Sequence, residues 1–401
     1  MSTVSIYETT EGNLTDTVRK ALGKTMAEGR IDLKEARVLI KPNVVKPAKS
    51  GSGIVTDSRV VKAVAEFVLE KKPEKVILGE GSAVGYDFPH RRDSFDCMEE
   101  AGISQLGNRL GIEVVDLNRD ELIDVSPPDA YVMKSFSVAK SAAEADVIID
   151  IPVIKTHVRT GITCALKNMK GVLPGDWKKR THQLGLDKGI VDLNRAVAPE
   201  LVLVDGTTAR EGAQTEENDK VDLGLILAGS DPVAVDAVCA SIAGFDPEEI
   251  LHVQLAGEAG LGLSSLEEIN IRGKRLEQVK RPFRRYHEAA ADLYGDATII
   301  EKNACTGCMG ELVSTFLYLK EAGLEQKISD LEVVMGSPEK LPRSTGNPLV
   351  IGKCARRFRD RGEYIPGCPP HGIEITEKAC SLLHEDPGRV RKIIEELHES
   401  E

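Results

Sequence analysis

Short runs of aliphatic and β-branched residues alternate with amphipathic stretches from the start of the chain to about residue 260, and this alternation constrains the fold more than any other feature. A polar turn follows each of the runs 38–40, 76–78, 114–115, 147–149, 201–204 and 225–227. Between them, residues 58–70 and 231–243 place apolar side chains at helical spacing. Strands that alternate with helices indicate an α/β fold, a mostly parallel sheet with helices on both faces.

The length of 401 residues exceeds the size at which a single hydrophobic core stops growing, so more than one domain is expected. We predict an α/β domain over residues 1–273 and a charged connector helix over 274–296. A small cysteine-rich α/β domain is predicted over 297–401, ending in helical stretches at 377–384 and 387–396. The basic residues at 281–285 fit the solvated face of the connector.

Composition excludes several classes of partner. The formal net charge is −12 and aromatic residues make up 4% of the chain, which disfavours nucleic-acid binding. No apolar run approaches the roughly 20 residues that span a bilayer, so no membrane partner is expected. Residues 1–5 enter a strand pattern without the features of a signal peptide. We therefore expect a cytoplasmic protein whose cysteines are reduced thiols or ligands.

The cysteines near the C-terminus form a pattern typical of a metal site. Cys305 and Cys308 make a Cys-x-x-Cys pair, Cys354 follows Gly-Lys, and Cys368 lies in Pro-Gly-Cys-Pro-Pro. Four thiolates select zinc or an iron–sulfur cluster over hard cations. Zinc sites with four cysteines usually use two such pairs, whereas this chain has one pair and two separate cysteines. The pattern favours a [4Fe–4S] cluster, with structural zinc and plain core or disulfide cysteines as the alternatives.

The ligand loops resemble, in residue type and order, the proximal [4Fe–4S] site of two families. These are the hydrogenase small subunits and the 20-kDa-type subunit of respiratory complex I. The resemblance covers only the loops around Cys305, Cys308, Cys354 and Cys368, with shorter spacings between them. It implies that these four cysteines hold a [4Fe–4S] cluster.

Two loops of the large domain carry polar residues directly after predicted strands. Lys41 and Asn43 flank Pro42 at the end of the run 38–40, and Glu80 lies between two glycines after 76–78. Ligands of open α/β sheets bind at such strand ends. We predict that Lys41, Asn43 and Glu80 contribute to a site for an anionic small molecule. Ordinary surface turns are the alternative for the first loop.

A third segment concentrates positive charge in an otherwise acidic protein. It carries Lys155 and His157, then Lys167, Asn168 and Lys170. Local positive charge is what an anionic substrate or cofactor requires. We predict that Lys155 provides electrostatic stabilisation and that His157 transfers protons, although a lone histidine also serves as a structural hydrogen-bond partner.

Three further residues of the large domain have both a functional and a structural reading. Asp205 follows the run 201–204 and is expected to lie beside the third segment. Asp231 precedes Pro232 and reads as a helix N-cap. Cys164 lies within the cationic segment, where its thiol pKa could be lowered, although packing in the core or the loop is the preferred interpretation.

Several of these motifs resemble the domain-of-unknown-function family 362. They are Lys-Pro-Asn, Ile-Pro-x-x-Lys-Thr-His, Lys-Asn-x-Lys-Gly, Val-Asp-Gly and Asp-Pro-Val-Ala-Val-Asp-Ala, found in that order over roughly residues 36–260. Members of that family often carry ferredoxin-like or other iron–sulfur modules, so the resemblance implies a redox-linked role without naming a substrate. The cysteines of this chain depart from the commoner run of closely spaced cysteines in bacterial ferredoxins.

Two functions follow as expectations. The first is an iron–sulfur oxidoreductase or electron-transfer protein, with an anion-binding site in the large domain and a redox protein as its partner. The second is a non-redox enzyme of isomerase or racemase type, or an assembly or activation factor, in which zinc only stabilises the small domain. The lysines and histidine are faintly similar to those of nickel-pincer lactate racemases, without a residue-by-residue match.

Overall fold

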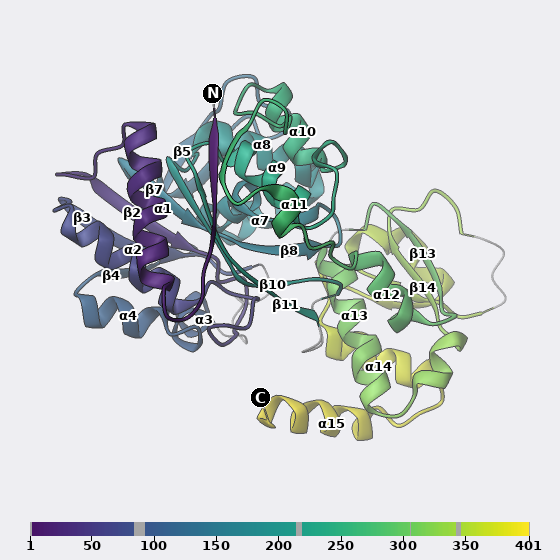
Figure 1. Ribbon diagram of the computed structural model, residues 1–401. Helices are drawn as coiled ribbons and strands as arrows, with labels where there is room; N and C mark the ends of the chain where they lie inside the picture. The colour runs from purple at the N-terminus through teal and green to yellow at the C-terminus, as the bar shows by residue number, and fades with distance from the viewer. Residues whose placement is uncertain (1, 84–92, 214–218, 305, 342–345, 401) are drawn as a thin grey trace. The chain divides into compact units, whose positions relative to one another are not determined.

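The computed structural model describes residues 2–83, 93–213, 219–304, 306–341 and 346–400 (Figure 1). The chain forms two compact units, Met1–Arg285 and Tyr286–Glu401. Both are α/β, and the larger contains a large, mostly parallel sheet flanked by helices. The fold class expected from the alternating pattern is therefore confirmed. No helix within the described ranges is long and apolar enough to cross a membrane.

The larger unit contains strands, α-helices and 3-10 helices. Its strands are β1 (Thr3–Glu8), β2 (Arg37–Pro42), β3 (Lys75–Glu80), β4 (Glu113–Asp116), β5 (Leu122–Val125), β6 (Phe136–Ala139), β7 (Val147–Ile151), β8 (Val153–His157), β9 (Gly161–Thr163), β10 (Leu201–Arg210), β11 (Lys220–Gly229) and β12 (Asn270–Gly273). Its helices are α1 (Leu14–Gly29), α2 (Ser58–Glu70), α3 (Ser94–Glu100), α4 (Ile103–Leu110), α5 (Lys140–Ala143), α6 (Ala165–Asn168), η1 (Met169–Val172), α7 (Gly175–Leu184), α8 (Leu186–Ala196), α9 (Pro232–Ile242), η3 (Pro247–Glu249), α10 (Leu251–Glu258) and α11 (Leu276–Val279).

The main sheet of the larger unit has the strand order β12-β1-β11-β10-β7-β2-β3-β4. From β10 to β4 every neighbouring pair is parallel, whereas β11 runs antiparallel to both β1 and β10. The carboxyl ends of β2, β3 and β7 therefore meet at one edge. Strands β5 and β6 form a separate antiparallel pair.

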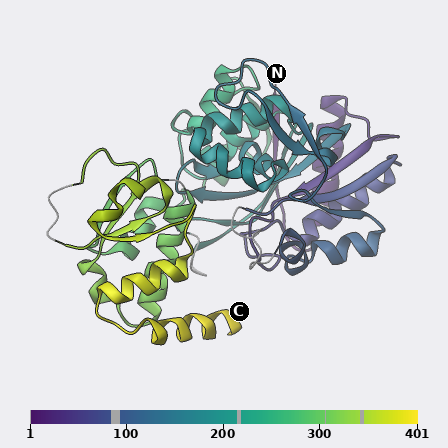
Figure 2. The ribbon, with the colours of Figure 1, turned by 180° about the vertical axis from the view of Figure 1, so that it is seen from behind.

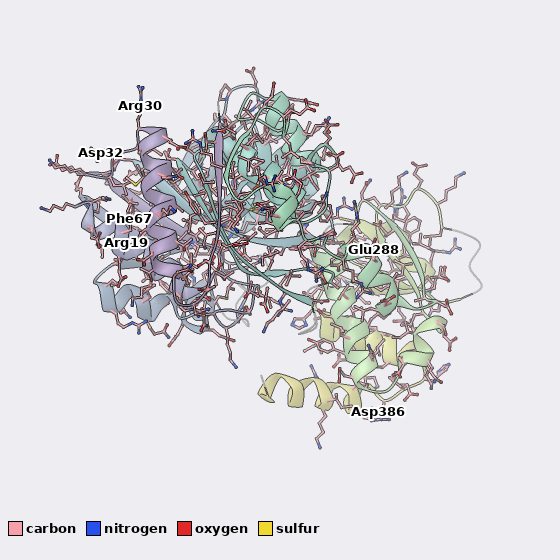
Figure 3. The ribbon with its side chains drawn as sticks, viewed as in Figure 1. Arg19, Arg30, Asp32, Phe67, Glu288 and Asp386 are labelled. Carbon is pink, nitrogen blue, oxygen red and sulfur yellow. The ribbon has the colours of Figure 1, made fainter. Side chains whose placement is uncertain are left out.

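Helices cover both faces of this sheet because its central strands are apolar on both sides. In β10, Leu201 and Leu203 pack with α1 and α2, whereas Val202 and Val204 pack with α8 and α9. Figure 1 and the reverse view in Figure 2 show the two helical layers. Within the first layer, the Arg19 guanidinium of α1 lies 5.8 Å from the centre of the Phe67 ring of α2 (Figure 3).

The segment 150–157 is largely strand, although the sequence pattern indicated a polar loop after a buried strand. Pro152 interrupts the ladder because it has no backbone N–H to donate. Its carbonyl instead accepts a hydrogen bond from the backbone N–H of Asp205 at 2.8 Å, and β8 then pairs with β10 and β9. Lys155 is held in this strand, and Asp205 lies beside it as expected.

The residues predicted as a connector helix, 274–296, divide between the two units. Val279 and Phe283 are buried in the hydrophobic core of the larger unit. Residues from Tyr286 form α12 (Tyr286–Tyr294) of the smaller unit, where the Tyr294 ring packs against Phe316 with centroids 5.2 Å apart. The apolar side chains of this charged segment decide which core each part joins.

The smaller unit is a four-stranded parallel sheet with helices. The strands β13 (Thr298–Lys302), β14 (Glu332–Gly336), β15 (Leu349–Ile351) and β16 (Glu363–Ile365) lie side by side in sequence order. Besides α12 it contains α13 (Thr306–Glu321), η4 (Glu325–Asp330), η5 (Lys353–Arg361), α14 (Gly372–Leu382) and α15 (Pro387–Ser400). The last two correspond to the predicted helical stretches, and α14 begins earlier than expected.

A buried carboxylate in α9 fixes the short helix that carries two predicted site residues. Asp236 is fully buried and accepts hydrogen bonds from the backbone N–H groups of Ala165 at 2.6 Å and Leu166 at 3.1 Å. These two donors open α6, which has only four residues and no cap of its own. Asp236 therefore holds Lys167 and Asn168, which lie on α6, at their places in the unit.

Replacing Asp236 with alanine is expected to destabilise the protein by roughly 3 kcal/mol, because two buried N–H groups lose their acceptor. Asp236→Asn keeps one acceptor oxygen and should lose less stability than Asp236→Ala. Thermal unfolding of the full chain measures both changes. Asp246→Ala removes the exposed cap of η3 and serves as the matched control, with an expected loss of about 1 kcal/mol. If Asp236→Ala lowers the stability no more than the control does, Asp236 does not hold α6 in place.

Candidate functional site

Polar residues from three neighbouring strands meet at the carboxyl edge of the large sheet. Lys41 ends β2 and pairs in register with Asp150 of β7, while Glu80 ends β3. All three side chains are almost completely buried. The structure thus brings Lys41 and Glu80 together, as their positions after successive strands predicted, and adds Asp150, which sequence reasoning did not select.

Lys41 and Glu80 form a buried ion pair. Their Nζ and Oε2 atoms are 2.9 Å apart, with side-chain exposures of 0% and 3%. The carboxylate also accepts hydrogen bonds from the backbone N–H groups of Val44 at 3.3 Å and Gly81 at 2.8 Å. Burial of two charges is costly unless both are paired and hydrogen-bonded, and here Glu80 receives these additional donors.

A chain of side-chain hydrogen bonds runs beside this pair. Lys155 Nζ donates to Asn43 Oδ1 at 2.6 Å, and Asn43 Nδ2 donates to Asn168 Oδ1 at 2.7 Å. Asn168 Nδ2 then donates to Asp150 Oδ1 at 2.7 Å. A second hydrogen bond from Lys155 reaches the carbonyl of Ile54 at 2.6 Å. Asn43 is thereby connected in one buried network with three residues more than 100 positions further along the chain.

The two ends of this chain have pKa values near neutrality. Burial raises the pKa of Asp150 to about 8, and its Oδ2 atom has no hydrogen-bond partner among the described residues. Burial and the nearby charges of Lys46 and Arg210 lower the pKa of Lys155 to about 7. Asp150 is therefore largely protonated at pH 7, and Lys155 is divided between ammonium and amine.

Two glycines let backbone approach the ion pair closely. A Cβ atom on Gly171 would lie 1.8 Å from Glu80 Oε1 and 2.7 Å from Lys41 Nζ. A Cβ on Gly81 would lie 2.5 Å from the carbonyl oxygen of Gly171. No side chain fits at either position, so this chain requires glycine at both.

Beside the buried network lies a second group of basic residues. Lys170 Nζ and His182 Nε2 are 2.9 Å apart, and Lys167 Nζ donates to Thr163 Oγ1 at 3.0 Å. His157 is half-buried, and its Nδ1 atom accepts hydrogen bonds from the backbone N–H groups of Arg159 and Thr160, each at 3.2 Å. We call this set the cationic cluster: His157, Arg159, Lys167, Lys170 and His182.

Desolvation and mutual repulsion keep much of the cationic cluster uncharged. Desolvation, with the charges of Lys167 and Lys170 among others, holds the pKa of His157 well below its usual range, and the same causes act on the pKa of His182. The pKa of Lys167 falls to about 7 by desolvation and the charge of Lys155. His157 is thus neutral at pH 7, with its hydrogen on Nε2 because Nδ1 is an acceptor.

Asp205 has a clear structural role. Its Oδ2 accepts a hydrogen bond from the backbone N–H of Asp57, the N-cap of α2, at 2.7 Å. Its Oδ1 accepts two from Thr207, from the backbone N–H at 3.0 Å and from Oγ1 at 2.6 Å. Burial still raises the pKa of Asp205 to about 6. Asp231 caps α9 through Val233 and Ala234, as expected.

Cys164 is a buried core residue. It is fully buried, and desolvation together with the neighbouring Cys239 raises the pKa of its thiol well above the ordinary value. The lowered thiol pKa that the surrounding lysines suggested is therefore wrong, because burial outweighs their charge. Packing in the core is the correct reading.

Lys178 belongs to the site although sequence reasoning did not select it. It is buried, donates to the carbonyl oxygens of Gly81 and Ser82, each at 2.9 Å, and hydrogen-bonds Asn118. Its position in a run of basic residues gave no sign of burial. The helical spacing of α7, which places Lys178 one turn before Thr181 on its buried side, is the signal that was available.

The cysteine loops lie at the carboxyl edge of the sheet in the smaller unit. Cys308 lies in the first turn of α13, after β13, whereas Cys354 follows β15 and Cys368 follows β16. All four strands are parallel, so these loops emerge at the same edge. Cys308 is buried, Cys368 half-buried and Cys354 exposed. Cys305 lies outside the described residues.

Backbone contacts join these loops. A Cβ atom on Gly352 would lie 2.9 Å from Cys308 Sγ. The backbone N–H of Gly352 donates to the carbonyl of Ile365 at 2.9 Å, and that of Lys353 donates to Gly367 at 2.8 Å. The described residues, which exclude Cys305, contain no group of three or more His, Cys, Asp or Glu side chains arranged to hold a metal ion.

Comparison with known proteins identifies a curated relative and, among several matching structures, a distant structural neighbour. Thylakoid-associated protein sll1697 of Synechocystis sp. is 29% identical over 259 residues, or 63% of this chain and 76% of that protein. The lactate racemase apoprotein of Thermoanaerobacterium thermosaccharolyticum aligns over 61% of this chain with a TM-score of 0.39 and 14% identity. The aligned part spans 57% of that protein, and a TM-score this low does not establish a common fold.

A family model supplies the assignment. Residues 38–241, just over half of the chain, match the model described as Domain of unknown function (DUF362). The match contains Lys41, Glu80, Asp150 and Lys155 and ends before the cysteine loops. The chain therefore belongs to the DUF362 family.

Proposed function

We propose that this protein is an iron–sulfur oxidoreductase or electron-transfer protein with a separate site for an anionic small molecule. The cluster would be held in the smaller unit by Cys305, Cys308, Cys354 and Cys368. The anion site would lie at the carboxyl edge of the large sheet. A cytoplasmic location and a redox protein partner belong to the same proposal.

The observation that carries the proposal is the convergence of the cysteine loops at one edge of a parallel sheet. Three of the four cysteines follow β13, β15 and β16, and Cys308 Sγ lies against the backbone of Gly352. Thiolates at separate strand ends fit a donor set for zinc or an iron–sulfur cluster. When bound, a [4Fe–4S] cluster supplies one-electron chemistry. Gly352 leaves room for the Cys308 sulfur, and the exposed Cys354 gives the site contact with solvent.

The anion site is proposed from the charge at the edge of the large sheet. Lys155 is the best candidate contact because its ammonium already donates two hydrogen bonds and an anion would favour its charged form. Lys167 and Lys170 would add positive potential, and Asn43 and Asn168 would orient the ligand through the network. His157 would donate from Nε2 in its neutral form. Lys41 and Glu80 neutralise each other's charge and would have a structural role beside the network.

The first test is metal and sulfide analysis of protein purified without oxygen. We expect about four irons and four sulfides per chain, with visible absorption that bleaches on reduction. Cys354→Ser and Cys368→Ser should each lose most of the iron because a ligand is missing. Cys380→Ala, in the buried face of α14, is the matched control and should keep its iron.

The same analysis separates the alternatives. One zinc per chain and no colour would overturn the redox proposal and leave a structural metal site beside a non-redox enzyme. Full iron in both serine variants would overturn the ligand assignment. Neither result would affect the anion site, which lies in the other unit.

Replacing Lys155 with alanine is expected to weaken binding of a small anion by at least about tenfold, because a charge-assisted hydrogen bond is lost. Isothermal titration calorimetry with inorganic phosphate and with oxalate measures the affinity. The iron content should stay unchanged. Lys188→Ala, an exposed lysine on α8, is the control and should bind as the natural protein does. Equal affinity of the Lys155 and Lys188 variants would contradict the anion site.

The affinity for the anion should also depend on pH. The pKa of Lys155 is lowered to about 7, so its ammonium predominates below pH 7 and is lost above it. Since a bound anion stabilises the charged form, binding takes up a proton at higher pH. We expect constant affinity at low pH and a fall of up to about tenfold per pH unit above 7. With oxalate, whose own charge is constant in this range, Lys155→Ala should reduce this dependence to the part that Lys167 contributes, because the pKa of Lys167 is also lowered to about 7.

A further inference from the structure

A strongly basic segment of the smaller unit contains one of the proposed cluster ligands. The 3-10 helix η5 spans Lys353–Arg361 and contains Cys354 near its start. Its charged side chains are five basic and one acidic, in a chain with a net charge of −12: Lys353, Arg356, Arg357, Arg359, Asp360 and Arg361. The local charge is therefore opposite to that of the whole protein.

These basic side chains are exposed, and the protein neutralises few of them. All five are exposed in the smaller unit. Among the described residues, Arg359 alone of the five is in an ion pair, at 3.7 Å from the exposed Asp360. The Arg357 guanidinium lies 4.6 Å from the centre of the Phe358 ring, which holds it in place without cancelling its charge. The surface keeps its positive potential.

The segment is fixed to the core, so the charges keep a defined arrangement. Ala355 is fully buried with Val334 and Val350, and Phe358 packs against that cluster. A 3-10 helix has three residues per turn, and side chains at i and i+3 eclipse one another. Lys353, Arg356 and Arg359 therefore form one row. Cys354, Arg357 and Asp360 form the adjacent row, next to the proposed cluster.

We propose that the exposed face of η5 is the docking surface for an acidic electron-carrier protein of the ferredoxin or flavodoxin kind. The inference rests on the proposed function in taking Cys354 as a cluster ligand. Electron transfer between proteins requires close approach of the two redox centres, and Cys354 is the exposed ligand on this face. Complementary charge steers such encounters and sets their rate.

A carrier protein fits this surface better than a nucleic acid does. Electron-transfer encounters use small interfaces, so one short segment suffices. Binding of single-stranded nucleic acid relies on aromatic platforms, whereas the one aromatic ring of η5, Phe358, is covered by Arg357 and packed on the core.

Titration of the iron-loaded full chain with two acidic probes, a plant-type ferredoxin and a flavodoxin, tests the proposal. At about 0.01 M salt we expect a complex with at least one probe, which weakens strongly at about 1 M salt. Arg356→Glu combined with Arg359→Glu should lower the affinity at least about tenfold. Lys320→Glu with Lys340→Glu makes the same charge change at exposed positions outside η5 and should bind within about twofold of the natural protein.

The possible outcomes distinguish a failure of the docking surface from a failure of the redox proposal. No complex with either probe, or equal losses in the two double variants, would overturn the docking surface. So would tighter binding of a single-stranded oligonucleotide that competes with the carrier through the same arginines. Iron content and melting temperature of the arginine variant should match the natural protein. If the protein contains no iron but its binding to the probe still depends on the arginines, the redox proposal is overturned and the docking surface stands. If the iron content is normal but binding does not depend on the arginines, the docking surface is overturned and the redox proposal stands.

Discussion

The buried ion pair between Lys41 and Glu80 is the constraint around which the edge of the large sheet is organised. Each ion costs several kcal/mol to desolvate, so the pair survives only where its remaining polar atoms are satisfied. Backbone N–H groups of Val44 and Gly81 donate hydrogen bonds to the Glu80 carboxylate. The backbone of Gly171 lies so close to Glu80 and Lys41 that no side chain would fit there. The loops after β2 and β3 and the turn η1 are thereby held together, and the Asn43–Asn168 network occupies the space that remains.

Both units place their chemistry at the same kind of location. In each, parallel strands end together, and the loops that follow bring residues distant in sequence into one region. The larger unit uses this edge for lysines, amides and carboxylates, whereas the smaller unit uses it for cysteines. The family match ends at residue 241, so the cysteine edge belongs to a part of the chain that the family model does not describe.

Much of the fold was predictable because strands such as 38–40 and 201–204 are β-branched runs, and because Asp231-Pro232 is a strong helix start. The antiparallel direction of β11 was not, since a local pattern carries no information on its partner. Lys41, Asn43 and Glu80 were selected from their positions after strands, and Lys155 and Asn168 from a cationic segment, and these residues do meet. Asp150 and Lys178 were missed because a carboxylate inside a strand and a lysine in a basic run resemble ordinary surface residues. Asp205 was selected for function, and its hydrogen bonds to Asp57 and Thr207 show a structural role.

The amide chain between Lys155 and Asp150 has a direction. As an ammonium Lys155 offers only donors, so Asn43 turns its oxygen toward it and its nitrogen toward Asn168, which repeats the arrangement toward Asp150. A ligand that accepts a hydrogen bond from Lys155 leaves this order intact. A ligand atom that displaced the lysine and could only accept would require both amides to rotate. An anion site at Lys155, as proposed, would thus select its ligand by hydrogen-bond polarity as well as by charge, through amides that do not themselves contact the ligand.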